Sequence, residues 1–157
     1  DGNFNITSSH YGPHHGPQVT TLFGMGGYEF DGIVAYPEPG SSTHYKDVTC
    51  VGCHMAEGEN GEGGHTFWPS DASCVVCHTS GIPDIEAEIQ GLFDQLAELL
   101  KANNVLDADS HLVPGVYPVE VAGAFYNWIG LVEDRSSGVH NPSYTRALLI
   151  NSIGALQ

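Results

Sequence analysis

The sequence predicts a mainly α-helical fold with long irregular loops and little β-structure. Two observations carry this prediction: apolar residues recur at helical spacing only in the C-terminal half, and the N-terminal part is rich in glycine and proline. The 157 residues include 20 Gly and 9 Pro, and only 41% of them are hydrophobic. Because glycine loses more backbone freedom on folding than other residues, aliphatic packing alone should stabilise such a chain poorly. We expect a single domain whose core contains something besides aliphatic side chains.

The chain divides into three segments of different expected structure. Residues 1–48 are turn-rich and show no helical period, so only short extended pieces are expected there, at residues 20–23 and 32–36. Residues 49–80 contain all four cysteines and a glycine-rich loop, with helical turns expected around the cysteines. Residues 84–157 form the helical C-terminal part.

Three helices are expected in that C-terminal part. Residues 84–102 place apolar side chains at helical spacing with acidic residues between them. Residues 119–134 form a second helix, and a third runs from Pro142 to about residue 155, because Asn141 is a good N-cap and proline suits the first helical position. The apolar side of the second helix is expected to contain Val121, Phe125, Trp128, Ile129 and Val132.

The charge of the chain excludes two classes of function. Four Lys or Arg stand against nineteen Asp or Glu, a formal net charge of -15. A nucleic-acid-binding protein needs basic residues to neutralise phosphates, and binding to an anionic membrane surface needs them too. The apolar runs are also far shorter than the ~20 residues of a membrane helix, so no membrane span is expected.

The four cysteines form two copies of one pattern, C-x-x-C-H. This pattern is the attachment signature of c-type haem: two thiols bond to the porphyrin, and the next histidine is the proximal ligand of the iron. The sequence therefore predicts two covalently bound c-type haems, and these apolar discs supply the missing core. The residues expected to hold them are Cys50, Cys53, His54, Cys74, Cys77 and His78.

The same four cysteines are compatible with two other chemistries, zinc binding and disulfide formation. The spacing C-x2-C-x20-C-x2-C lies at the edge of the zinc-ribbon range, and four thiolates would close a tetrahedral site. However, zinc has no need for a histidine directly after each second cysteine, and zinc ribbons usually carry basic residues. Disulfides within each C-x-x-C are a third alternative, but no thioredoxin-like βαβ pattern surrounds them.

The sixth ligand of each iron has more candidates than two haems need. His65 lies between the two motifs beside glycines that allow a close approach to a porphyrin, and His140 directly precedes a helix N-cap. His14 and His15 belong to a cluster that could instead bind a haem propionate or a metal ion, and His44 lies shortly before the first motif. Both methionines are poorly placed, so bis-histidine ligation is expected, with a lower potential than His/Met ligation gives.

Several stretches resemble multihaem c-type cytochromes of bacteria and archaea. The resemblance covers residues 9–18, 26–30, 50–55 and 64–67, and residues 128–134, 137–142 and 144–149 look similar to the C-terminal helices of that group. This ending also looks distantly like the tail of pentahaem nitrite reductases. It implies an exported electron carrier, extracellular or at the cell surface, otherwise periplasmic. Some members of the group polymerise into extracellular filaments in which a histidine of one subunit ligates a haem of the next.

The same resemblance implies ligands and partners. His65 and His140 would be distal ligands, and His14 or His15 the ligand to a neighbouring subunit, although this chain has two haem motifs where the commoner filament subunits have more. The expected partners are other redox proteins or copies of the chain itself. The expected function is electron transfer without enzymatic activity. The alternative is a dihaem peroxidase or small reductase with one open haem, although neither motif has the lysine that replaces the proximal histidine in nitrite reductases.

Overall fold

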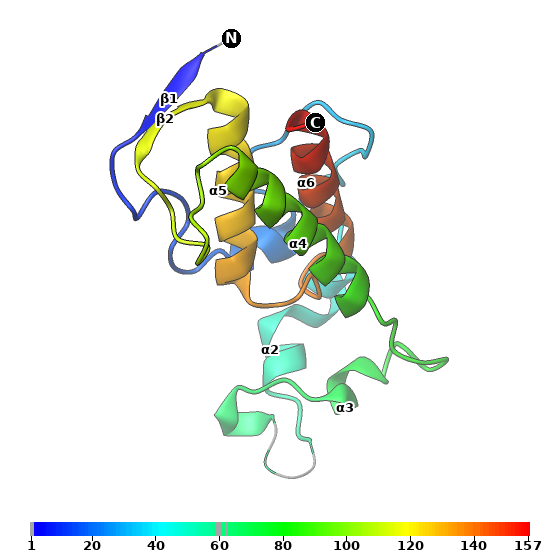
Figure 1. Cartoon of the computed structure of the whole chain (residues 1–157). Coiled ribbons are helices and arrows are strands. Elements are labelled where there is room, and N and C mark those ends of the chain that lie inside the picture. Colours follow the sequence, from blue (N-terminus) through cyan, green and yellow to red (C-terminus); the bar gives the residue numbers. More distant parts are fainter. Residues whose placement is uncertain (1, 59–60, 62) are drawn as a thin grey trace.

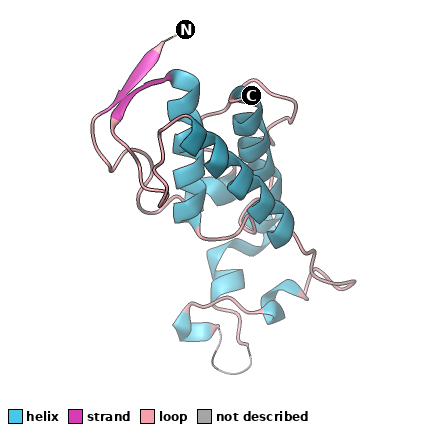
Figure 2. Ribbon diagram, in the orientation of Figure 1, coloured by secondary structure: helices cyan, strands magenta, loops and turns pink. Residues whose placement is uncertain are grey.

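Three long helices form the body of the molecule. The computed structural model describes residues 2–58, 61 and 63–157, and it places α4 (Glu86–Ala102), α5 (Val119–Asp134) and α6 (Pro142–Ala155) in mutual contact (Figure 1). The three helices predicted from the sequence are thus confirmed. The structure as a whole is mainly helical with one small sheet, as the ribbon in Figure 2 shows.

Helix α5 lies at the centre of this body. It contacts α4, α6, both strands and the short helix α1 (Gln18–Phe23), so that residues 121–125 are buried around its whole circumference. One residue differs from the prediction: Val132, expected on the apolar side, is 40% exposed, and the buried position of that turn belongs to Leu131. Both α4 and α6 pack against α5, so its buried surface does not follow the single apolar stripe that the sequence pattern assumes.

The junction of α5 and α6 is fixed by a cap. The Asn141 side chain accepts a hydrogen bond from the Tyr144 backbone N–H at 3.2 Å, with Pro142 at the first helical position. Further along α6, Arg146 forms a two-fold bond to Glu88 of α4, with both N···O distances 2.7 Å. The hydrogen bond from this guanidinium lowers the pKa of the Glu88 carboxyl against a small opposing effect of desolvation.

A two-stranded antiparallel sheet joins the N-terminus to the segment before α5. Strand β1 (Asn3–Ile6) pairs with β2 (Gly115–Pro118), and Ile6 enters the core at 1% exposure. Neither strand was expected: each is only four residues long, and the region before Pro118 was predicted as a loop. Strands this short show too few alternations for a pattern to reveal them.

The prediction of an extended piece at residues 20–23 was wrong. These residues belong to helix α1, which ends where Gly24 adopts a φ of 87° and donates to the carbonyls of Thr20 and Thr21. The helix is docked on α5, because the Gln18 side chain donates to the Glu133 carbonyl at 2.9 Å. Docking and the glycine cap outweigh the weak helix propensity of two threonines.

Two buried asparagines hold the N-terminal loop against the helices. Asn127 of α5 bonds to both the N–H and the C=O of Tyr28, at 2.6 and 2.7 Å, and Asn151 of α6 does the same to Val34, at 3.1 and 2.8 Å. Each side-chain amide therefore makes the two hydrogen bonds that a neighbouring strand would otherwise make to this backbone. For this reason residues 32–36, predicted to be extended, have a fixed backbone without forming a strand.

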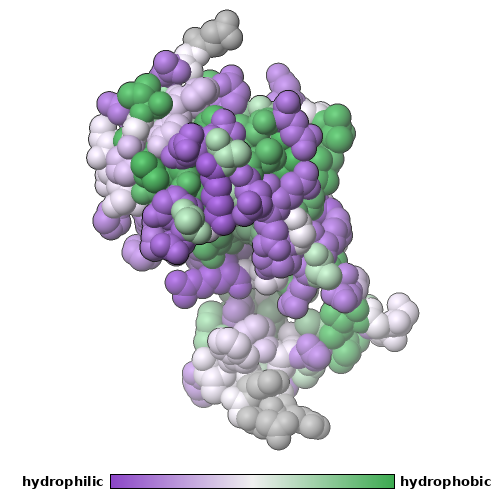
Figure 3. Space-filling model, in the orientation of Figure 1, coloured by the Kyte–Doolittle hydropathy of each residue, from purple (hydrophilic) through white to green (hydrophobic). Residues whose placement is uncertain are grey.

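Residues 44–82, which we call the motif segment, begin with a π-helical turn that contacts α1 and continue into α2 (Thr49–His54) and α3 (Asp71–Cys74), which project from this body (Figure 1). None of the described residues between Tyr36 and Ile89 belongs to the hydrophobic core. In Figure 3 this lower part is mostly pale with green patches, whereas purple side chains dominate the front of the helix bundle. The exposed large apolar side chains of the motif segment from α2 onward are Val51, Met55, Phe67, Trp68, Val75, Val76 and Ile82.

No helix in the described part of the chain combines the length and the apolar character that a membrane crossing requires.

Candidate haem sites

The first C-x-x-C-H motif lies on a helix that begins with an unusual backbone. A π-helical turn, η1 (His44–Val48), leads directly into α2, and Thr49, the first residue of α2, has a φ of 63°. A π-turn and a positive φ at a β-branched residue are both unfavourable, and both are concentrated at functional sites. Helix α2 then presents Cys50, Cys53 and His54 within one continuous stretch.

The second motif begins on α3 and ends in a turn. Helix α3 stops at Cys74, and the chain continues as a turn in which the His78 N–H donates to the Cys74 carbonyl at 2.9 Å. The helical turn expected at each motif is thus complete at the first and partial at the second. Helices α2 and α3 contact each other, so the two motifs are neighbours in space.

All four cysteines are free thiols, with Cys50 and Cys77 exposed. Burial raises the pKa of the Cys53 thiol, and the neighbouring Cys74 raises it further. Four sulfurs around zinc would be about 3.8 Å apart, given a Zn–S bond of ~2.3 Å. Among the described residues, however, the group with three metal-binding atoms within 4.8 Å is exposed and contains no cysteine: Asp107, Asp109 and His111.

Two pairs of imidazole rings lie at the motif segment, which contributes three of the four rings. His54 pairs with His140, with ring centroids 6.3 Å apart, and His78 pairs with His44 at 6.2 Å. An imidazole nitrogen binds a first-row transition metal at ~2.0 Å and its ring centre lies ~1.1 Å further out, so two imidazoles on opposite sides of one ion have centroids about 6.2 Å apart. Each pair combines one motif histidine with one histidine from outside the motif.

In three of these four rings the Nδ1 atom already has a partner. The Nδ1–H groups of His54, His44 and His140 donate to the Phe67 carbonyl at 2.9 Å, the Val139 carbonyl at 2.8 Å and an Asp134 carboxylate oxygen at 2.8 Å. A carbonyl or carboxylate can only accept, so Nδ1 carries a proton, and in the neutral ring Nε2 then has the free lone pair that a metal needs. This arrangement is typical of metal-binding histidines.

Phe67 fixes the His54 ring in two ways. Its carbonyl accepts the Nδ1–H, and its own ring stacks on the imidazole with centroids 4.7 Å apart and an interplanar angle of 13°. To do both, Phe67 adopts a left-handed backbone with a φ of 59°. This second unfavourable φ in the motif segment again lies beside a motif histidine.

The loop between α5 and α6, residues 136–140, serves both imidazole pairs. Val139 gives its carbonyl to His44, and the next residue, His140, is itself a member of the other pair. Asp134, the last residue of α5, orients His140 and also accepts a hydrogen bond from the Ser136 hydroxyl. Sequence reasoning did not single out Asp134, since an acidic residue at a helix end is common and only the fold shows that its side chain is buried.

The other candidate histidines lie elsewhere. His65, in the short helix η2 (Gly64–Thr66), is exposed, and among the described residues no imidazole pairs with it. His14 lies between His10 and His15, with ring centroids 5.3 and 6.5 Å away. The Nε2 atom of His14 is buried without a hydrogen-bond partner, whereas His15 is exposed.

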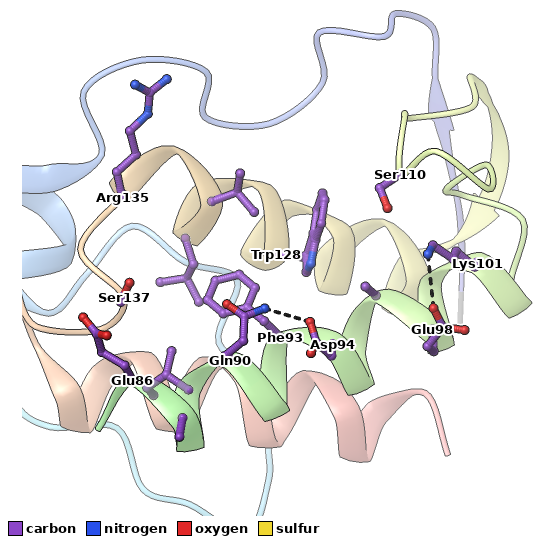
Figure 4. A pocket seen from close by; sticks show the side chains of 15 residues that line it. Glu86, Gln90, Phe93, Asp94, Glu98, Lys101, Ser110, Trp128, Arg135 and Ser137 are labelled. Carbon is purple, nitrogen blue, oxygen red and sulfur yellow. Dashed lines mark hydrogen bonds and ion pairs between the residues drawn. The ribbon is translucent and has the colours of Figure 1, made fainter. Parts of the chain in front are cut away.

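A groove between α4 and α5 is unrelated to these residues. It encloses about 720 Å³, and Figure 4 shows Phe93 and Trp128 in it together with acidic and amide side chains of α4. Neither cysteine nor histidine lines it. The cysteines and the two imidazole pairs therefore lie at the motif segment and the 136–140 loop, away from this groove.

No protein-family model, curated protein or solved structure matches the chain. The function is accordingly argued from the residues themselves.

Proposed function

We propose that this chain is an exported electron-transfer protein that binds two c-type haems covalently, one through Cys50 and Cys53 and the other through Cys74 and Cys77. The proposal depends on one observation: the histidine of each C-x-x-C-H motif has a second imidazole nearby, with ring centroids 6.3 Å apart in one pair and 6.2 Å apart in the other. The axial ligands would be His54 with His140 in the first site and His78 with His44 in the second.

The chain's own residues suit this cofactor in two further respects. The free Nε2 atoms of three of the histidines are the donors that iron requires, held in place by Nδ1 hydrogen bonds. The motif segment also exposes apolar side chains without a core of its own, which a large apolar disc would cover. When bound, each haem supplies a one-electron couple whose potential depends on its axial ligands and their hydrogen bonds.

Two observations favour an electron carrier over an enzyme. Each motif histidine has a second imidazole with its ring centroid 6.2 or 6.3 Å away, and an iron bound by both rings of a pair would have no open position for a substrate. The contact of α2 with α3 brings the two attachment segments together, as transfer between two centres needs. The protein's task is then to orient the ligands and limit water access. A dihaem peroxidase or reductase is the alternative, and it requires one histidine pair to be broken.

The ligand assignment is tested with two histidine variants. In the purified wild-type protein we expect two low-spin haems per chain, without a high-spin charge-transfer band and without a spectral shift on adding cyanide or nitrite. Replacing His140 with alanine should make one haem high-spin and cyanide-binding, because its sixth ligand is lost. The matched control is His65→Ala, which should leave both haems low-spin.

Three results would count against the proposal. A high-spin haem in the wild type would favour the enzyme, and a colourless zinc-containing protein would exclude haem altogether. A high-spin signal from His65→Ala but not from His140→Ala would reverse the ligand assignment.

Other redox proteins or further copies of the chain are the proposed partners. Since each iron would already have two histidines of the same chain, a polymer would need no ligand from a neighbouring subunit. We therefore expect both His14→Ala and His15→Ala to keep any polymer seen in micrographs of the wild type. Loss of the polymer in the variant of the exposed His15, but not in that of His14, whose Nε2 atom is buried, would instead show cross-subunit ligation and would overturn one of the two pairs within the chain.

A further inference from the structure

The two histidines from outside the motifs have hydrogen-bond partners of different charge. His140 donates from Nδ1 to a carboxylate oxygen of Asp134 at 2.8 Å, whereas His44 donates from Nδ1 to the neutral Val139 carbonyl at 2.8 Å. The Asp134 side chain is only 2% exposed. Its other carboxylate oxygen accepts from the Ser136 hydroxyl.

The position of Asp134 is poor for the stability of α5. A carboxylate at the C-terminus of a helix faces the negative end of the helix dipole, and burial adds a desolvation cost. Among the described residues, the side chains hydrogen-bonded to the Asp134 carboxylate are His140 and Ser136, and Arg135 next to it is exposed. The hydrogen bonds from His140 and Ser136 therefore compensate the buried charge of Asp134. The cost of this charge is explained if its role is to orient His140.

A negative hydrogen-bond partner makes an imidazole a stronger electron donor to a metal than a neutral partner does. The oxidised iron carries one positive charge more than the reduced iron, so a buried anion nearby favours the oxidised form and lowers the potential. Exposed carboxylates such as Asp47, three residues after His44 in η1, act through solvent and salt and have much weaker effects. The two sites therefore differ in one buried charge.

We infer that Asp134 is a positioning residue that, through His140, makes the haem site of Cys50 and Cys53 the one of lower potential. This inference rests on the proposed function. The two sites then differ in potential, so the first electron taken up resides at the Cys74 and Cys77 site. The Asp134 charge maintains this difference in potential.

The inference is tested by a spectroelectrochemical titration of the haem-loaded protein. Asp134→Asn keeps the side-chain shape and an oxygen that can accept from Nδ1, but removes the charge. We expect it to raise the lower of the two potentials by at least a tenfold change in the reduction equilibrium, ~59 mV for a one-electron couple, and to leave the higher one in place. The matched control is Asp47→Asn, which should move neither potential.

Two further variants separate a charge effect from a structural one. Ser136→Ala removes a donor to Asp134 and leaves its charge less compensated, so the lower potential should fall, opposite to the shift in Asp134→Asn. His140→Met should raise the same potential that Asp134→Asn raises, because a thioether ligand raises it, and this assigns the site.

The outcomes distinguish this inference from the proposed function. Two low-spin haems in the wild type with no shift in Asp134→Asn, or with a shift of the higher potential, would overturn the inference alone. The same holds if Ser136→Ala and Asp134→Asn move the potential in the same direction. A wild-type protein without haem would overturn the proposed function.

Discussion

Replacing Cys50, Cys53, Cys74 and Cys77 together with serine is expected to unfold residues 44–82 while α4, α5 and α6 stay folded. The helix bundle has its own buried core, which includes Leu96, Leu100 and Phe125, each at most 1% exposed. The motif segment contributes no described residue to that core. Several of its large apolar side chains are exposed and would gain burial from a bound group, and burying one such side chain fully stabilises by ~1.5–3 kcal/mol.

Hydrogen exchange followed by mass spectrometry measures this directly. In the wild-type holoprotein, amides of α2 and α3 should exchange slowly, and in the four-serine variant they should exchange within the dead time of the experiment. Peptides from α5 should be protected in both, which serves as the internal control. Equal protection of α2 in the two proteins would show that the motif segment folds without a bound group.

Replacing Phe125 with alanine is expected to cost about 3–5 kcal/mol of the free energy of unfolding. The ring is 1% exposed at the middle of α5, and its centroid lies 6.1 Å from those of both Tyr11 and Trp128. The loss leaves a cavity that three surrounding elements cannot easily close. Because a domain of this size has only ~5–15 kcal/mol of stability in total, the variant should unfold at a much lower urea concentration.

The matched control for this variant lies on the same helix. Val132 was assigned to the same apolar side by the sequence pattern but is 40% exposed, so Val132→Ala should change stability by less than ~0.5 kcal/mol. Circular dichroism in urea measures both. Similar losses in the two variants would contradict the central position of Phe125.

The long helices were predictable because α4 and α5 show apolar residues at helical spacing, and because Asn141 and Pro142 mark the start of α6. Helix α1 was not, because it depends on docking to α5 and on the left-handed Gly24. Strands β1 and β2 were missed because four residues contain too little pattern.

For the candidate site, the spacing of Cys50, Cys53 and His54 identifies the motif ligand without any structure. The second histidine of each pair cannot be identified from spacing, because it comes from another part of the chain. His65 and His140 looked equivalent in sequence, yet the fold brings only His140 beside a motif histidine. His44 was only one of several candidates, and its pairing with His78 follows from the π-helical turn that places it.

The oxygen that orients His44 and the backbone nitrogen of His140 belong to the same peptide group. Since a peptide group is planar and rigid, it cannot tilt under one histidine without also moving the other. The Ser136 hydroxyl lies 3.3 Å from that backbone nitrogen and restrains the plane from its opposite edge. One amide therefore supports a histidine of each imidazole pair, His44 through its oxygen and His140 through its nitrogen.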